Sequence, residues 1–194
     1  KTMFSLGKYY EQQKEYDNML KYYLMAINHE NDEAMYNLGN YYEQKKDYAN
    51  MEKYFLMAIE KKNSNAMNCF GNHYRKQKKY DDMMVCYMMA LESENYIALN
   101  GLGNYYGDIG YTKTAVRCYL QSIEHKCVAS MYNLANNCKK QKKYDDMVKY
   151  HLMAIENGYD ASIDSLITYY ESVNDESNMM KYYVLKMKSS DNVP

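Results

Sequence analysis

Apolar residues in the middle of the chain recur with the spacing of amphipathic helices. In one stretch they fall at i, i+3, i+4 and i+7, the positions that share one helical face: Met35, Leu38, Gly39 and Tyr42. The next stretch shows the same spacing: Met51, Tyr54, Phe55, Ala58 and Ile59. A short polar segment, residues 45–48, separates the two. The pattern predicts a pair of helices, about Asp32–Gln44 and Ala49–Lys61, joined by a tight turn.

The same pattern recurs along the chain with a period of 32 residues. Its clearest marker, the anchor position, is a glycine in four copies and continues as Ala135 and Ile167: Gly7, Gly39, Gly71 and Gly103. Leucine or phenylalanine precedes the anchor in all six copies. The fold class that follows is all-α, an α-solenoid of about six helix-turn-helix repeats in a superhelix, because a lone helix pair cannot bury its apolar face but a stack can. The expected repeats are about 1–31, 32–63, 64–95, 96–127, 128–159 and 160–190, in one array over residues 1–194.

Each repeat should contain a helix A, which carries the anchor, and a helix B that follows it. Asn31, Asn63 and Asn95 stand where helix A needs an N-cap acceptor. Acidic residues suit the first turn of helix B: Asp17, Asp81 and Asp145. We expect a flexible methionine twelve residues after the anchor to fill the space above the glycine: Met19, Met51, Met83, Met147 and Met179.

Charge and cysteine content restrict the functions that fit this chain. The 24 basic and 25 acidic residues give a net charge of −1, which provides no general attraction to nucleic acid or anionic membranes. No apolar run is long enough to span a membrane. The five cysteines contain no CxxC pair, so we expect reduced thiols in a helical core, in a reducing cytoplasm, in preference to redox or metal roles. Lys1 is not an initiator methionine, and we expect the chain to be part of a longer protein or to lack its first residues.

Several motifs resemble the tetratricopeptide repeat (TPR) and its Sel1-like relatives. They are the stretch 36–42 (YNLGNYY), then Asp47–Tyr48, Tyr54–Phe55 and Ala58–Ile59. The period of 32 residues differs from the 34 of the TPR. The resemblance covers the whole chain and implies a non-enzymatic scaffold that binds a protein or peptide partner in a concave groove. The abundance of Lys, Asn, Tyr and Met also resembles repeat proteins of giant DNA viruses.

By this resemblance, helix A residues line the groove. The residue after the anchor is asparagine in four copies: Asn40, Asn72, Asn104 and Asn136. An asparagine amide can both donate to and accept from a peptide backbone, so this ladder is a candidate peptide site. Neighbouring positions add further candidates: Tyr36, Asn37, Asn68, Asn100, Tyr132 and Asn133. The alternative is that these amides bond to neighbouring repeats or to water.

Two other surfaces are less distinctive. Lysines and an arginine at the A–B turns are followed at once by aspartates, which favours a solvated mixed-charge rim over an RNA or acidic-partner patch. Helix B carries an additional apolar column, which either covers gaps between repeats or is exposed for dimerisation or docking: Met25, Met57, Met89 and Met153. We favour packing. Self-association or docking through helix B or the array ends remains open.

Catalytic and metal-binding patterns are missing from the sequence. The four histidines lack ligand spacing, and no nucleophile elbow, Walker or dinucleotide-binding signature occurs. We therefore expect no enzyme activity, no cofactor and no metal. The remaining alternatives are an RNA-binding helical repeat, which would need a basic groove, and a structural spacer or oligomerisation module of a larger assembly.

Overall fold

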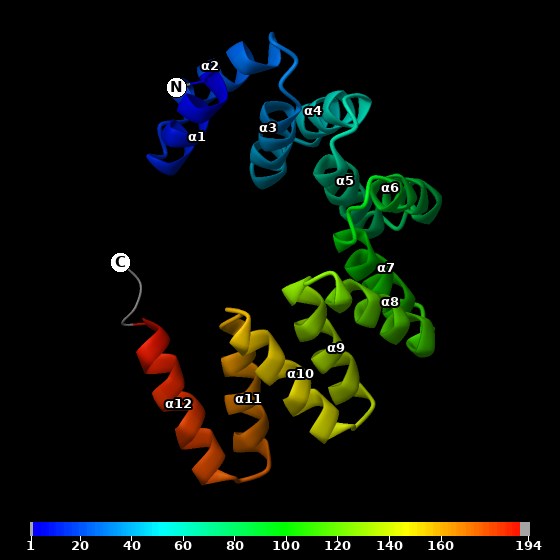
Figure 1. Cartoon of the computed structure of the whole chain (residues 1–194), viewed down its shortest axis with the longest axis vertical. Coiled ribbons are helices and arrows are strands. Elements are labelled where there is room, and N and C mark those ends of the chain that lie inside the picture. Colours follow the sequence, from blue (N-terminus) through cyan, green and yellow to red (C-terminus); the bar gives the residue numbers. More distant parts are fainter. Residues whose placement is uncertain (1, 191–194) are drawn as a thin grey trace. The chain divides into compact units, whose positions relative to one another are not determined.

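The computed structural model describes residues 2–190, and this part of the chain consists of helices and short turns (Figure 1). Lys1 and Pro194, the ends of the expected array, lie outside the described residues. Twelve helices follow one another over the described range: α1 (Met3–Gln12), α2 (Tyr16–Ile27), α3 (Asp32–Gln44), α4 (Tyr48–Glu60), α5 (Ser64–Lys76), α6 (Tyr80–Glu92), α7 (Ile97–Asp108), α8 (Thr112–Glu124), α9 (Val128–Lys140), α10 (Tyr144–Glu156), α11 (Ala161–Ser172) and α12 (Glu176–Ser190). Odd-numbered helices are helices A and even-numbered ones helices B. The prediction of an all-α chain of helix pairs is confirmed.

The chain forms two compact units, residues 1–98 (unit one) and 99–194 (unit two), and their boundary falls inside α7. In unit one, each helix A packs on its own helix B, and α2 and α4 also pack on the helix A that follows them. Unit two repeats this order, with α8 against α9 and α10 against α11. Each unit is therefore a stack of helix pairs. The single array over all six repeats stays a prediction.

The turns explain why the period is 32 residues. At the end of α3, Lys46 is left-handed with φ of 59°, and the amide of Asp47 donates to the carbonyl of Tyr42 at 2.9 Å, which is a Schellman turn. Asp47 is also the N-cap of α4. The turn into α5 closes in the same way, with Lys62 at φ of 62° and Asn63 as the next cap. Two 13-residue helices and two three-residue turns then complete the repeat.

Two of the three expected N-caps are present, Asn31 of α3 and Asn63 of α5. The side-chain oxygens of Asn31 and Asn63 accept the amide three residues further on, at 2.8 and 2.9 Å. Asn95 instead accepts the amide two residues further on, at 3.2 Å. The amino group of Asn63 also donates to Asp32 at the start of the preceding helix A, at 2.7 Å, so this cap links adjacent repeats. The expected aspartates lie in the first turns of their helices B: Asp17, Asp81 and Asp145.

An aromatic ring, not a methionine, lies above each glycine anchor. A Cβ added to Gly71 would lie 2.7 Å from the ring of Tyr87, sixteen residues further on, and one added to Gly103 would lie 2.5 Å from the ring of Tyr119. A Cβ added to Gly7 or Gly39 would likewise overlap the ring of Tyr23 or Phe55. Carbon atoms cannot approach so closely, so the ring requires the glycine. The expectation of methionine at this place is wrong, although four of the five methionines are fully buried in the core: Met19, Met51, Met83 and Met147.

The last two repeats change the anchor and the ring together. In the fifth repeat the anchor is Ala135, and the ring position holds His151, whose imidazole is smaller than a phenol and is fully buried. In the sixth repeat the anchor is Ile167, and the ring position holds Tyr183, which is 37% exposed and donates to Glu171 at 2.8 Å. A larger anchor thus goes with a smaller ring or with one turned outward. This agrees with the interpretation that the ring above the anchor leaves no space for a side chain there.

Cysteines contribute to the cores as expected. Three are buried, and burial raises the pKa of each of their thiols: Cys86, Cys118 and Cys138. All five are free thiols. These side chains therefore behave as small apolar groups.

Candidate peptide-binding surface

The asparagines that follow the anchors are partly exposed on helices A, and two of them are oriented by tyrosines. The Tyr87 hydroxyl donates to Asn72 Oδ1 at 2.8 Å, and the Tyr119 hydroxyl donates to Asn104 Oδ1 at 2.8 Å. These are the rings that cover the glycine anchors, so one side chain both closes the core and fixes an amide. Because the carbonyl oxygen accepts from the tyrosine, the amide has its amino group left to offer a ligand. Asn72 and Asn104 therefore keep their amino groups as donors and one lone pair of each carbonyl oxygen as an acceptor, and pairing with both peptide groups stays a prediction.

Asn40 has a different partner. It donates to the hydroxyl of Tyr36 on its own helix, and that hydroxyl lies 3.8 Å from the sulfur of Cys69 in the next repeat. Burial, followed by the proximity of Cys69, raises the pKa of Tyr36 to about 12. Tyr36 thus joins two helices A, and its hydroxyl is already engaged.

Other predicted positions also form contacts between repeats. Asn133 donates to Asn100 at 2.9 Å, from one helix A to the preceding one. Asn37 donates to the hydroxyl of Tyr23 in the preceding repeat at 3.3 Å. The ring of Tyr132 packs between the rings of His151 and Tyr159, with centroid separations of 5.6 and 5.1 Å. Asn68 is only 8% exposed. The alternative use of these side chains, bonding between repeats, is thus the one that the geometry favours for Asn37, Asn100 and Asn133.

A small polar hollow of about 90 Å³ brings part of the predicted ladder together in unit two. It combines three predicted residues with five others: Asn104, Asn133 and Asn136, with Gly107, Asp108, Tyr119, Asn137 and Lys140. The Asn137 carbonyl is already bonded to Gln141 at 2.6 Å. Asn40 and Asn72 belong to unit one. The hollow is rich in amide donors and suits a ligand group with acceptor oxygens, such as a peptide carbonyl.

Sequence reasoning missed Asn137, Lys140 and the two orienting tyrosines. Asn137 and Lys140 follow Asn136 at one and four residues, so the helical spacing of the fifth repeat was a usable signal. The two tyrosines were not singled out from the sequence, and only their hydroxyl distances of 2.8 Å show that they orient the amides.

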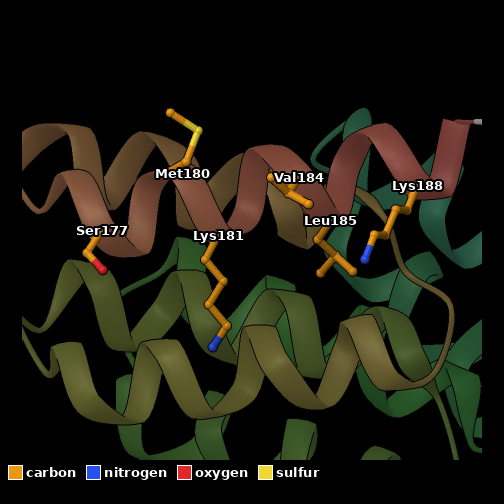
Figure 2. Close-up of a pocket in the computed structure, with 6 residues that line it drawn as sticks. All are labelled: Ser177, Met180, Lys181, Val184, Leu185 and Lys188. Atoms are coloured by element: carbon orange, nitrogen blue, oxygen red, sulfur yellow. The ribbon is translucent and has the colours of Figure 1, made fainter.

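A larger hollow lies elsewhere, on the last helix (Figure 2). Its volume is about 590 Å³, and all of its lining residues come from α12: Ser177, Met180, Lys181, Val184, Leu185 and Lys188. A third hollow, of about 540 Å³, lies at the A–B turns of α3 and α5. There Lys76 pairs with Glu43 at 3.1 Å, as expected for a mixed-charge rim.

Residues 2–190 show no cluster of three or more histidine, cysteine or acidic side chains that could hold a metal ion. Within the same range, no helix is both long and apolar enough to cross a membrane.

Comparison with known proteins gives the family of one repeat and the fold of the whole. The tetratricopeptide repeat family model matches residues 32–65. No curated protein matches the sequence. The structure is similar to a Sel1 repeat protein from Oxalobacter formigenes, with a TM-score of 0.73 and 17% identity over 96% of this chain and 86% of that one.

Two further solved structures show the same fold. PilF of Pseudomonas aeruginosa aligns with a TM-score of 0.71 and 15% identity over 98% of this chain and 91% of that one. A protective antigen of uropathogenic Escherichia coli strains, with an SLR fold, aligns with a TM-score of 0.66 and 16% identity. The alignment covers 96% of this chain and 45% of that one. These likenesses show the fold: the described chain has the architecture of α-helical repeat solenoids.

Proposed function

We propose that this chain is a protein-interaction scaffold that binds an extended peptide segment of a partner on its helix A surface. The observation that carries the proposal is the orientation of Asn72 and Asn104, whose carbonyls accept from Tyr87 and Tyr119 at 2.8 Å and whose amino groups are left as donors. A peptide backbone supplies carbonyl acceptors at regular intervals in any sequence. A fixed donor at this position, Asn72 in unit one and Asn104 in unit two, suits such a ligand in each unit by itself.

The fold supports this proposal because helical repeat stacks present extended surfaces built from equivalent positions. The near-neutral charge supports a peptide over RNA, since binding to phosphates needs a net basic surface. Action without catalysis, a reducing cytoplasmic location and a viral source stay predictions.

The test uses substitutions that remove only the donor. Asn72→Asp and Asn104→Asp keep an oxygen for the tyrosine hydroxyl but replace the amino group with a second acceptor. Peptides selected from a random displayed library against the native chain would be measured by calorimetry against each variant. We expect each variant to bind about tenfold more weakly, as loss of one hydrogen bond of about 1.4 kcal/mol implies.

Asn28→Asp is the matched control, because it makes the same change of charge at an exposed residue, the C-cap of α2. Its peptide affinity should be unchanged. Selected peptides that bind the two donor variants as tightly as the native chain would exclude the helix A surface. Affinity that falls steeply with salt, at a slope of several counterions, would instead indicate a phosphate-bearing ligand.

A further inference from the structure

The helix α12 exposes an apolar stripe in unit two. Met180, Val184 and Met187 follow one another at four and three residues, so they share one helical face, and they are 59, 45 and 66% exposed. On the opposite side, Tyr182 is 3% exposed and stacks on Tyr170 of α11, with a centroid separation of 5.6 Å. The helix thus packs on α11 through one side, and its other side carries these three residues, which we name the α12 stripe.

The same positions of the preceding helices B bind the next helix A. In α10, the counterparts 32 residues earlier are Val148, Leu152 and Ile155, and all three are partly buried and pack against the core formed mainly by α11. In α8, Val116 and Ile123 pack against the core to which α9 contributes. Because its counterparts in unit two each bind a helix, the α12 stripe has the shape and spacing of a helix-binding surface.

Leu185 extends this surface on one side. It lines the hollow of about 590 Å³ on α12 (Figure 2) and is 37% exposed. Its counterpart in the second repeat is Met57, in the additional apolar column of helix B, which is partly buried and packs against the cores of two adjacent repeats. The packing interpretation of that column is therefore confirmed for Met57, whereas the same position is exposed in α12.

Lysines lie at the edge of the α12 stripe. Figure 2 shows Lys181 and Lys188, which precede and follow Val184 by three and four residues, and both are exposed. The counterparts of Lys188 in four preceding helices B are all glutamates: Glu60, Glu92, Glu124 and Glu156. The charge at this edge is thus reversed in α12. A ligand of this surface should therefore differ from the chain's own helices A and carry acidic residues.

The same lysines argue against a second copy of α12 as the ligand. When two α12 stripes pair antiparallel about Val184, Lys181 of each copy meets Lys188 of the other, and when they pair parallel each lysine meets its own counterpart. Like charges that meet across an interface weaken it in both orientations. We propose that the α12 stripe binds an acidic amphipathic helix of a partner protein, placed as α11 is placed on α10. The helix A surface takes no part, so this proposal is independent of peptide binding there.

The probe is a peptide with the sequence of residues 159–175, which contains α11. It carries the apolar residues that pack against α10, and it has no basic residue but four acidic ones: Asp160, Asp164, Glu171 and Asp175. A second peptide has lysine at these four positions. Both are stapled to keep them helical, because a helix of this length is only marginally stable alone.

Fluorescence anisotropy then compares the two labelled peptides on the native chain. The acidic peptide should bind at least about tenfold more tightly than the basic one. Equal affinities, or no binding of either peptide, would overturn the proposal.

Variants of exposed residues locate the binding site. Met180→Gln with Val184→Gln removes apolar contact and should abolish binding of the acidic peptide, with far-UV circular dichroism unchanged because both side chains are exposed. Lys181→Glu with Lys188→Glu should reverse the preference, so that the basic peptide binds more tightly. A peptide that displaced α11 from α10 would respond to neither pair of changes, and that result would show that the α12 stripe is not the site.

Lys149→Glu is the matched control. Lys149 is the counterpart of Lys181 in α10, is exposed, and lies over the ring of the following tyrosine at the same 5.4 Å. This change should leave both peptide affinities unchanged, and an effect equal to that of Lys181→Glu would refute the role of the α12 lysines. Sedimentation equilibrium covers the remaining outcome. Self-association of the native chain that Met180→Gln with Val184→Gln abolishes would identify a second copy as the ligand and overturn the assignment to a partner protein.

Discussion

Replacing Gly71 with alanine tests the packing of ring over glycine that recurs in each repeat. The added Cβ would lie 2.7 Å from two ring carbons of Tyr87 and 3.3 Å from the Cβ of Cys86. Overpacking of this kind costs about 1–3 kcal/mol. Alanine in a helix interior returns about 1 kcal/mol relative to glycine. The net effect should be a loss of up to about 2 kcal/mol in the free energy of unfolding.

The ring is the stated cause, so removing it should remove the cost. The fifth repeat combines Ala135 with His151 in a fully buried position, and Tyr87→His transfers that combination to the third repeat. In the Tyr87→His background, Gly71→Ala should be neutral or stabilising. The double-mutant cycle should then give a coupling equal to the overpacking cost, about 1–3 kcal/mol, within the range measured for residues in contact. Urea unfolding followed by far-UV circular dichroism gives the four free energies.

Gly107→Ala is the control for helix propensity without overpacking. Its added Cβ would meet no heavy atom closer than 3.9 Å, so this change should raise stability by about 0.5–1 kcal/mol. An equal cost of Gly71→Ala with Tyr87 and with histidine would refute the role of the ring. So would a stabilisation by Gly71→Ala that equals the one at Gly107.

Two further predictions concern a turn and a buried histidine. Lys46 is left-handed with φ of 59°, and Gly110 occupies the corresponding turn position with φ of 84°. In urea unfolding, Lys46→Gly should therefore raise the free energy of unfolding by about 0.5–1 kcal/mol, whereas Lys45→Gly should not raise it. Burial, with a smaller contribution from Lys139, lowers the pKa of His151 from 6.5 to about 4. Its neutral form therefore stabilises the fold fully above pH 6.5, and this contribution is lost toward pH 4 by at most about 1.4 kcal/mol per pH unit. His151→Leu should flatten that part of the stability–pH curve, and parallel curves would contradict the assignment.

The sequence was sufficient to predict the helices because both ends of a helix carry a local signal, a capping residue at the start and a left-handed turn residue at the end. The pattern predicted Asp32–Gln44, and α3 has these bounds, because Asn31 caps its start and Lys46 closes its end. Helix B was predicted one residue late, at Ala49, since Asp47 had not been recognised as both turn and cap. Local chemistry repeated at a fixed period therefore determines secondary structure well.

What lay across helices was harder to predict. Methionine was expected above glycine because it is adaptable, but Phe55 occupies that place, and only the geometry of the helix crossing selects the ring four residues further on. The direction of Asn104 depends on a hydroxyl that is fifteen residues away in sequence and 2.8 Å away in space. Periodicity identifies which positions are equivalent, whereas the partner of each side chain depends on how two helices cross.

The three-residue turns restrict how the copies of this repeat can diverge. Residues 45–47 already end one helix and begin the next, so an inserted residue would have to extend a helix and would rotate its remaining face by about 100°. Divergence among copies must then proceed by substitution at fixed length. The repeats are therefore modular. Residues 32–63 and 64–95 begin and end at equivalent positions of the turns, so the two repeats could be exchanged, with their surfaces, without changing the turns that join them.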